Sequence, residues 1–211
     1  MRKLPVYLLI DVSESMSGAP FAAVQNALRD MMSFMERDPD LLETCFISVI
    51  TYSDQAEQIV PLTDILEFQL PELNTHGGRS GLGAALRFVT ECANREVLPA
   101  TQERRGDWKP FLFIFSNGRA DDGLEEGIRA LRARKWEHIV ACIPDKEAKN
   151  GNFKKITGSF LDLESINEYS FLPYFFPPDD IIECESLSGT SMPPCPSLDE
   201  LPSLQPEKQT T

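Results

Sequence analysis

Short apolar runs alternate with longer amphipathic segments over the first two-thirds of this chain. The apolar runs are residues 4–10, 46–52, 111–115, 138–143 and 159–163. The segments whose apolar side chains recur at helical spacing are residues 20–37, 82–92, 124–135 and 146–156. Strands that alternate with helices predict a mostly parallel sheet covered by helices on both faces, a three-layer doubly wound α/β fold of Rossmann-like type. Residues 57–60 are expected to add one antiparallel edge strand through a hairpin.

The composition changes after about residue 172. Half of the 16 prolines lie beyond that point, together with an excess of acidic residues over a single base, Lys208. We therefore expect one domain over residues 1–172 and a proline-rich acidic tail over residues 173–211. The aromatic start of this tail is expected to dock on the domain, and the part beyond about residue 185 is expected to be disordered.

Charge and cysteine content narrow the possible partners and the compartment. A net charge of -13 argues against binding to nucleic acid or to an anionic membrane surface. The first apolar stretch is short, contains Pro5 and is cut by Asp11, which argues against a secretory signal. The number of cysteines is odd, and no two of them have the close spacing of metal ligands, which indicates a reducing cytoplasm. They are Cys45, Cys92, Cys142, Cys184 and Cys195.

Polar residues follow the most apolar strands at the points where those strands end. Asp11, Ser13 and Ser15 follow the first strand, and Asn117 lies in a Ser-Asn-Gly turn after residues 111–115. Ligands of doubly wound sheets bind beyond the carboxyl ends of the strands. Carboxylate and hydroxyl oxygens are ligands that suit Mg²⁺, Mn²⁺ or Ca²⁺. Two interpretations stay open at this point: a metal site, or polar residues that are simply solvated at a strand end.

Enzymatic interpretations find less support in the residues. A nucleophilic Ser13 or Ser15 would need a base, and the two histidines are His76, near the Gly77-Gly78 turn, and His138, at the start of a strand. The chain contains neither a nucleophile-elbow motif nor a phosphate-binding loop with its lysine. Phosphatase chemistry on Asp11 would usually need a second carboxylate where Ser13 stands. A metal-dependent hydrolase acting on a phosphorylated substrate is retained as the alternative function.

Several motifs, in the same order, resemble those of the von Willebrand factor A (VWA) family. They are LLIDVSESM after the first strand, GGRSGLGAAL at the start of a later helix, and SNG after FLFIF. The resemblance extends over about residues 2–163 and is closer to the bacterial TerY-like branch, which is associated with tellurium resistance. It implies the VWA fold and the family's metal-ion-dependent adhesion site (MIDAS) for Mg²⁺ or a related ion.

The resemblance also implies which residues form that metal site. Asp11, Ser13 and Ser15 match the first motif, and Ser80 stands where the family usually has a threonine. Asn117 replaces the usual aspartate of the third motif, so it can offer an oxygen but no negative charge. Because a carboxylate recruits a divalent ion better than an amide does, the ion is expected to bind weakly. Asp121 or Asp122 would restore charge if it reached the site, whereas Arg79 and Arg119 would oppose a cation.

The function implied by the resemblance is that of a cytoplasmic, non-enzymatic protein-interaction module. A metal ion in the site would accept an acidic side chain from a protein partner. TerY-like proteins are associated with a protein kinase and a PP2C-type phosphatase, which implies a role in stress response or signalling. The tail then contains five candidate phosphorylation sites: Ser186, Ser188, Thr190, Ser191 and Ser197.

Overall fold

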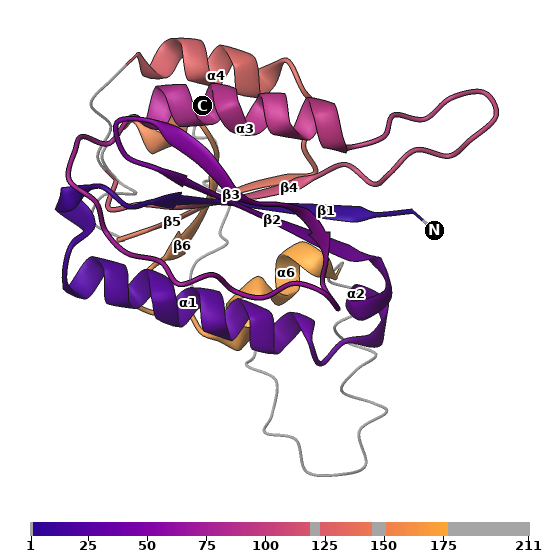
Figure 1. Ribbon diagram of the computed structural model, residues 1–211, viewed down its shortest axis with the longest axis horizontal. Helices are drawn as coiled ribbons and strands as arrows, with labels where there is room; N and C mark the ends of the chain where they lie inside the picture. Colours follow the sequence, from indigo (N-terminus) through magenta and orange to yellow (C-terminus); the bar gives the residue numbers. More distant parts are fainter. Residues whose placement is uncertain (1, 119–122, 145–150, 177–211) are drawn as a thin grey trace, which may run out of the picture.

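The computed structural model describes residues 2–118, 123–144 and 151–176 and has three layers (Figure 1). Within these residues, six strands form one sheet in the order β3-β2-β1-β4-β5-β6. Their bounds are β1 Leu4–Asp11, β2 Cys45–Tyr52, β3 Ala56–Asp64, β4 Phe111–Phe115, β5 His138–Ile143 and β6 Ser159–Asp162. The pairs are parallel except for β2 with β3, so the predicted fold class is confirmed.

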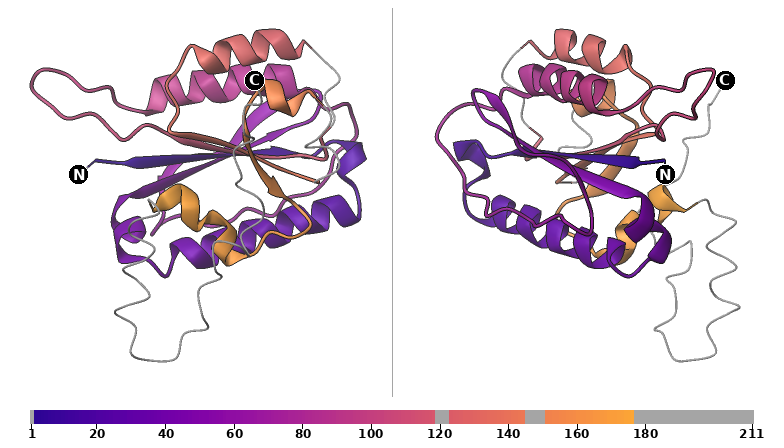
Figure 2. Two further views of the ribbon diagram at one scale, coloured as in Figure 1. Left: turned by 180° about the vertical axis from the view of Figure 1, so that it is seen from behind. Right: turned by 45° about the vertical axis from the view of Figure 1, so that its right-hand side comes forward.

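Helices cover both faces of the sheet, as Figure 2 shows from two further directions. On one face lie α3 (Leu82–Glu96) and α4 (Leu124–Arg132). On the other lie α1 (Ala19–Met35), α2 (Pro39–Thr44) and the short C-terminal α6 (Leu172–Phe175). Single 3₁₀ turns complete the described elements: η1 Glu14–Met16, η2 Phe153–Lys155 and η3 Glu168–Phe171.

The central strand β1 explains why its sequence is continuously apolar. Val6 and Leu8 pack into the core on the α1 side, whereas Tyr7 and Leu9 pack into the core on the α3 and α4 side. All four side chains are fully buried. Successive strand residues point to opposite faces, so a strand with helices on both sides needs apolar residues at every position.

Two elements differ from their sequence predictions. The edge strand β3 extends over Ala56–Asp64 rather than residues 57–60, and it tolerates Pro61 because an edge strand can lack one backbone donor. The predicted helix over residues 146–156 is wrong in its described part. Residues 151–156 contain only the turn η2, because Gly151 adopts a positive φ of 68° that a helix does not allow.

The residues just before and after position 172 pack against the sheet. Phe171 is fully buried, and its ring lies 5.7 Å from the ring of Phe113. Phe175 stacks on Phe113 with ring centroids 6.1 Å apart. The rest of the predicted tail, residues 177–211, lies outside the described residues, and so do its five candidate phosphorylation sites.

Helices α3 and α4 approach each other closely at two glycines. A Cβ atom on Gly127 would lie 2.4 Å from the carbonyl oxygen of Gly83. We expect Gly127→Ala to lower the free energy of unfolding by about 1–3 kcal/mol, because overpacking outweighs the gain in helix propensity. Urea unfolding checks this, with the exposed Gly158→Ala as the control, since a Cβ there meets nothing within 4 Å. An equal effect of the two substitutions would contradict the prediction.

Candidate functional site

The candidate site lies at the carboxyl edge of the sheet, where the parallel strands end. Asp11 is the last residue of β1 and is paired in register with Tyr52, the last residue of β2. On the other side, Ile10 pairs with Phe115, so Ser116 follows directly beside Asp11. Three neighbouring strands thus deliver a carboxylate, a phenol and a hydroxyl to one point.

Asp11 is fully buried and accepts three hydrogen bonds. Its Oδ1 accepts from the backbone N–H of Ser13 at 2.9 Å. Its Oδ2 accepts from the hydroxyl of Ser80 at 2.8 Å and from the hydroxyl of Ser116 at 3.3 Å. These donors satisfy both carboxylate oxygens, so a negative charge is held beneath the surface of the edge.

The remaining predicted residues join the same network toward the surface. The hydroxyls of Ser13 and Ser15 lie 3.0 Å apart. The side-chain amide of Asn117 donates to the hydroxyl of Ser15 at 2.8 Å and to its carbonyl at 3.1 Å. The structure therefore brings together all five residues predicted from the sequence. We refer to them, with Ser116, as the Asp11 cluster: Asp11, Ser13, Ser15, Ser80, Ser116 and Asn117.

Backbone contacts fix the loop that supplies Ser80. The N–H of His76 donates to the carbonyl of Val12 at 2.7 Å, and the N–H of Gly81 donates to the carbonyl of Ser53 at 2.8 Å. The Asp54 carboxylate accepts from the N–H of Arg79 at 2.9 Å. These contacts tie the loop to the ends of β1 and β2, so Ser80 is held over Asp11 before any ligand arrives.

Sequence reasoning missed two members of this site. Ser116 was noted only as part of a polar turn, although it contacts the Asp11 carboxylate directly. Tyr52 is fully buried, and its hydroxyl has no hydrogen-bond partner among the described residues. Burial, and then the charge of Asp11, raises the pKa of Tyr52 well above its usual value, so the phenol stays protonated. Only the register of β1 with its two neighbours reveals either residue.

The charge and donor set of the Asp11 cluster limit what it can hold. It contains one carboxylate, four serine hydroxyls and one side-chain amide. The oxygen atoms of all these groups are hard donors for a cation. In the described part of the chain, no three His, Cys, Asp or Glu side chains gather where they could hold a metal. Arg119, Asp121 and Asp122, which would change this balance, lie outside the described residues. Among the described residues of the cluster, Asp11 therefore supplies the one formal negative charge.

The two histidines lie in different places relative to the serines. His138 begins β5 and packs edge-on against the rings of Phe111 and Tyr174, at the opposite end of the sheet. Burial lowers the pKa of His138, which favours the neutral ring of a packed residue. His76 lies near the site through its backbone, but among the described residues its side chain forms no hydrogen bond with Ser13 or Ser15. Neither Ser13 nor Ser15 is therefore hydrogen-bonded to a histidine in the part of the chain that the structure describes.

The structure also shows the state of the cysteines and the character of the helices. Cys45, Cys92 and Cys142 are buried free thiols, while Cys184 and Cys195 lie outside the described residues. In residues 2–118, 123–144 and 151–176, no helix has the length and apolar character needed to cross a membrane.

Comparisons with known proteins agree with this architecture. The family model of the von Willebrand factor type A domain matches residues 6–167. No match was found among curated protein sequences. The strands and loops that carry the Asp11 cluster all lie within the matched residues.

Solved structures provide two examples of the same fold. Proximal thread matrix protein 1 from the mussel byssus superposes with a TM-score of 0.55 at 13% identity, over 78% of this chain and 46% of that chain. The pilus adhesin SpaC from Lactobacillus rhamnosus GG also superposes with a TM-score of 0.55 at 13% identity, over 77% of this chain and 28% of that chain. This chain therefore spans less than half the length of either protein, and at this identity the likeness concerns the fold alone.

Proposed function

The chain belongs to the von Willebrand factor type A domain family, and we propose that it is a non-enzymatic protein-interaction module that binds its partner at the Asp11 cluster. The observation that carries this proposal is the assembly of the cluster itself. Residues from three separate segments meet at the carboxyl edge of the sheet around one buried carboxylate. Such an edge is where doubly wound sheets bind their ligands.

We further propose that the cluster holds Mg²⁺, or Mn²⁺ or Ca²⁺ in its place. Asp11, Ser13, Ser15 and Ser80 would offer oxygen atoms, directly or through water, and Asn117 would contribute its amide oxygen after rotation of the side chain. The bound ion would supply an open position for an acidic side chain of the partner. One carboxylate compensates only half of a divalent charge, so the site would bind the ion weakly on its own.

Asn117→Asp is expected to strengthen cation binding by at least about tenfold, because a second carboxylate is added where an amide now faces Ser15. Calorimetric titration with Mg²⁺, Mn²⁺ and Ca²⁺ measures the change. Asn26→Asp, which adds the same charge on the exposed side of α1, is the matched control and should leave the isotherms unchanged.

The absence of heat in both the wild-type chain and Asn117→Asp would count against even a latent metal site. A gain confined to Asn117→Asp would identify the amide as the reason for weak binding. An equal gain in Asn26→Asp would mean that the overall charge, rather than the cluster, attracts the ion.

The biological setting follows from the resemblance to the TerY-like branch. We propose a cytoplasmic assembly for stress response or signalling, with a Ser/Thr kinase and a PP2C-type phosphatase as partners. Phosphopeptide mapping with a cognate kinase tests the five candidate sites in residues 186–197. A tail that stays unmodified would remove this part of the proposal.

The interaction is tested by capture of a partner from the host extract with the immobilised chain. We expect capture in Mg²⁺, reduced capture in EDTA, and no capture by Asp11→Asn. A screen for phosphatase and nuclease activity with Mg²⁺ and Mn²⁺ tests the alternative. If the screen detects turnover and Asp11→Ala abolishes it, the chain is a metal-dependent hydrolase rather than an interaction module.

A further inference from the structure

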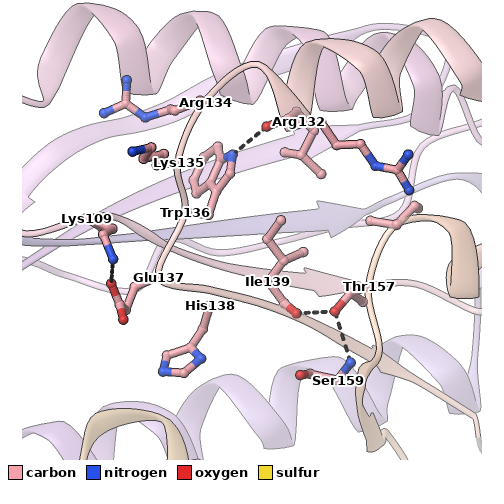
Figure 3. Close-up of a pocket in the computed structure, with 12 residues that line it drawn as sticks. Lys109, Arg132, Arg134, Lys135, Trp136, Glu137, His138, Ile139, Thr157 and Ser159 are labelled. Carbon is pink, nitrogen blue, oxygen red and sulfur yellow. Dashed lines mark hydrogen bonds and ion pairs between the residues drawn. The ribbon is translucent and has the colours of Figure 1, made fainter.

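A basic cavity lies at the opposite end of the sheet from the Asp11 cluster. Figure 3 shows the residues that line it. It has a volume of about 480 Å³ and opens where β4 and β5 begin. Its lining includes four cations: Lys109, Arg132, Arg134 and Lys135. In Figure 3, Arg134 and Lys135 lie on one side of the Trp136 ring and Arg132 on the other. In a chain with a net charge of -13, such a local excess of positive charge is unusual.

Most of this positive charge is not neutralised within the described residues. Lys109 pairs with Glu137 at 2.7 Å. Arg132 instead donates to the carbonyl of Lys155 at 2.8 Å, and Arg134 donates to the side-chain oxygen of Asn94 at 2.5 Å. In the part of the chain that the structure describes, none of Arg132, Arg134 and Lys135 forms an ion pair. The cavity therefore favours an anionic occupant.

Two further properties narrow the kind of occupant. The Nε atom of Arg134 is buried and has no hydrogen-bond partner among the described residues. Apolar side chains also line this cavity: Leu131, Trp136, Ile139 and Ile156. The cavity thus suits an acidic peptide with apolar residues between its carboxylates, rather than a small inorganic anion.

The chain itself contains such a peptide shortly after its last described residue. Phe176, the last described residue, lines a second cavity that shares Lys109, Glu137 and His138 with the basic one. The sequence DDIIECE follows at residues 179–185, with two isoleucines between acidic pairs. Asp179 follows Phe176 by three residues, a length of chain that spans up to about 10 Å.

We propose that residues 179–185 of this chain dock in the basic cavity, with Asp179 and Asp180 beside its cations and the isoleucines against its apolar residues. Arginine binds carboxylates in a two-pronged geometry that lysine cannot reproduce, so Arg132 and Arg134 anchor the segment. An external acidic protein then reaches this face only by displacing the chain's own segment. The proposal concerns the amino ends of the strands and is independent of the Asp11 cluster.

The test measures how well Trp136 is shielded in the full chain. Trp108 is replaced by Phe throughout, which leaves Trp136 as the only indole because the chain has two tryptophans. Fluorescence quenching is recorded with iodide and with neutral acrylamide. Asp179→Asn/Asp180→Asn is compared with the charge-matched pair Asp199→Asn/Glu200→Gln, and all four positions lie outside the described residues.

We expect Asp179→Asn/Asp180→Asn to raise both quenching constants at least about twofold, and the control pair to leave them near the wild-type values. Unchanged constants in both pairs would overturn the proposal. An equal rise in both pairs would also overturn it, because it would reflect general charge rather than this segment. A rise with iodide alone would mean attraction of the anion without any uncovering of Trp136, which contradicts docking.

Discussion

Replacing Asp11 by Asn is expected to abolish divalent-cation binding and, with it, the capture of a partner. Asp11 supplies the one carboxylate of the cluster within the described residues, so the substitution leaves a neutral set of hydroxyls and amides. Loss of that charge should weaken binding by more than about 100-fold, or roughly 3 kcal/mol. Asn keeps the acceptor for Ser13 but brings an amide donor toward Ser80 and Ser116, which costs about 1–3 kcal/mol of stability.

The measurement is a Mg²⁺ titration of Asp11→Asn, made both in the wild-type background and in Asn117→Asp. If the wild-type chain gives little heat, the effect of Asp11→Asn can still be measured in the Asn117→Asp background, where binding is expected to be stronger. Asp54→Asn is the matched control, because it removes a carboxylate from the same edge while its amide oxygen can still accept from the backbone N–H of Arg79. Undiminished heat in Asp11→Asn would show that the ion binds elsewhere.

Phe113→Ala is expected to lower the free energy of unfolding by about 3–5 kcal/mol. Phe113 is fully buried at the centre of β4. Its ring contacts those of Phe171, Tyr174 and Phe175 at centroid distances of 5.7, 5.9 and 6.1 Å. The substitution therefore leaves a cavity between the sheet and α6. The surrounding aromatic rings are rigid and fill such a cavity poorly.

Urea denaturation followed by circular dichroism measures this effect. Leu66→Ala is the control, because Leu66 is 72% exposed and its truncation should change stability by less than about 0.5 kcal/mol. A double-mutant cycle with Phe175→Ala should give a coupling of about 0.5–1.5 kcal/mol between the stacked rings. A loss below about 1 kcal/mol for Phe113→Ala would mean that residues 171–176 are not a fixed part of the core.

The arrangement of the sheet was predictable because its central strands β1 and β4 are almost continuously apolar. The end of such a strand can be read from the sequence, and this is why Asp11 and Asn117 were expected at one edge. The positions of Ser116 and Tyr52 depend on the pairing of β1 with two strands far along the chain. No local pattern reports that register, so both residues were missed.

The sequence prediction was less successful where short-range signals compete. Residues 146–156 have helical spacing, but Gly151 adopts a positive φ and the described part forms only a turn. The helix α2 was not expected, although Asp38 caps it by accepting from the N–H of Leu41 at 2.9 Å. The basic cavity was also missed, because Lys109 and residues 132–135 meet only through the parallel pairing of β4 with β5.

The most direct test of the Asp11 cluster as a binding surface is amide hydrogen exchange of the chain, alone and with a partner recovered by capture in Mg²⁺. The two ends of β1 lie roughly 20 Å apart, so the method separates the two faces of the molecule. We predict new protection in residues 12–17, 75–81 and 116–118, and its loss in Asp11→Asn. Protection confined to residues 104–109 and 132–138, at the amino ends of the strands, would contradict the account.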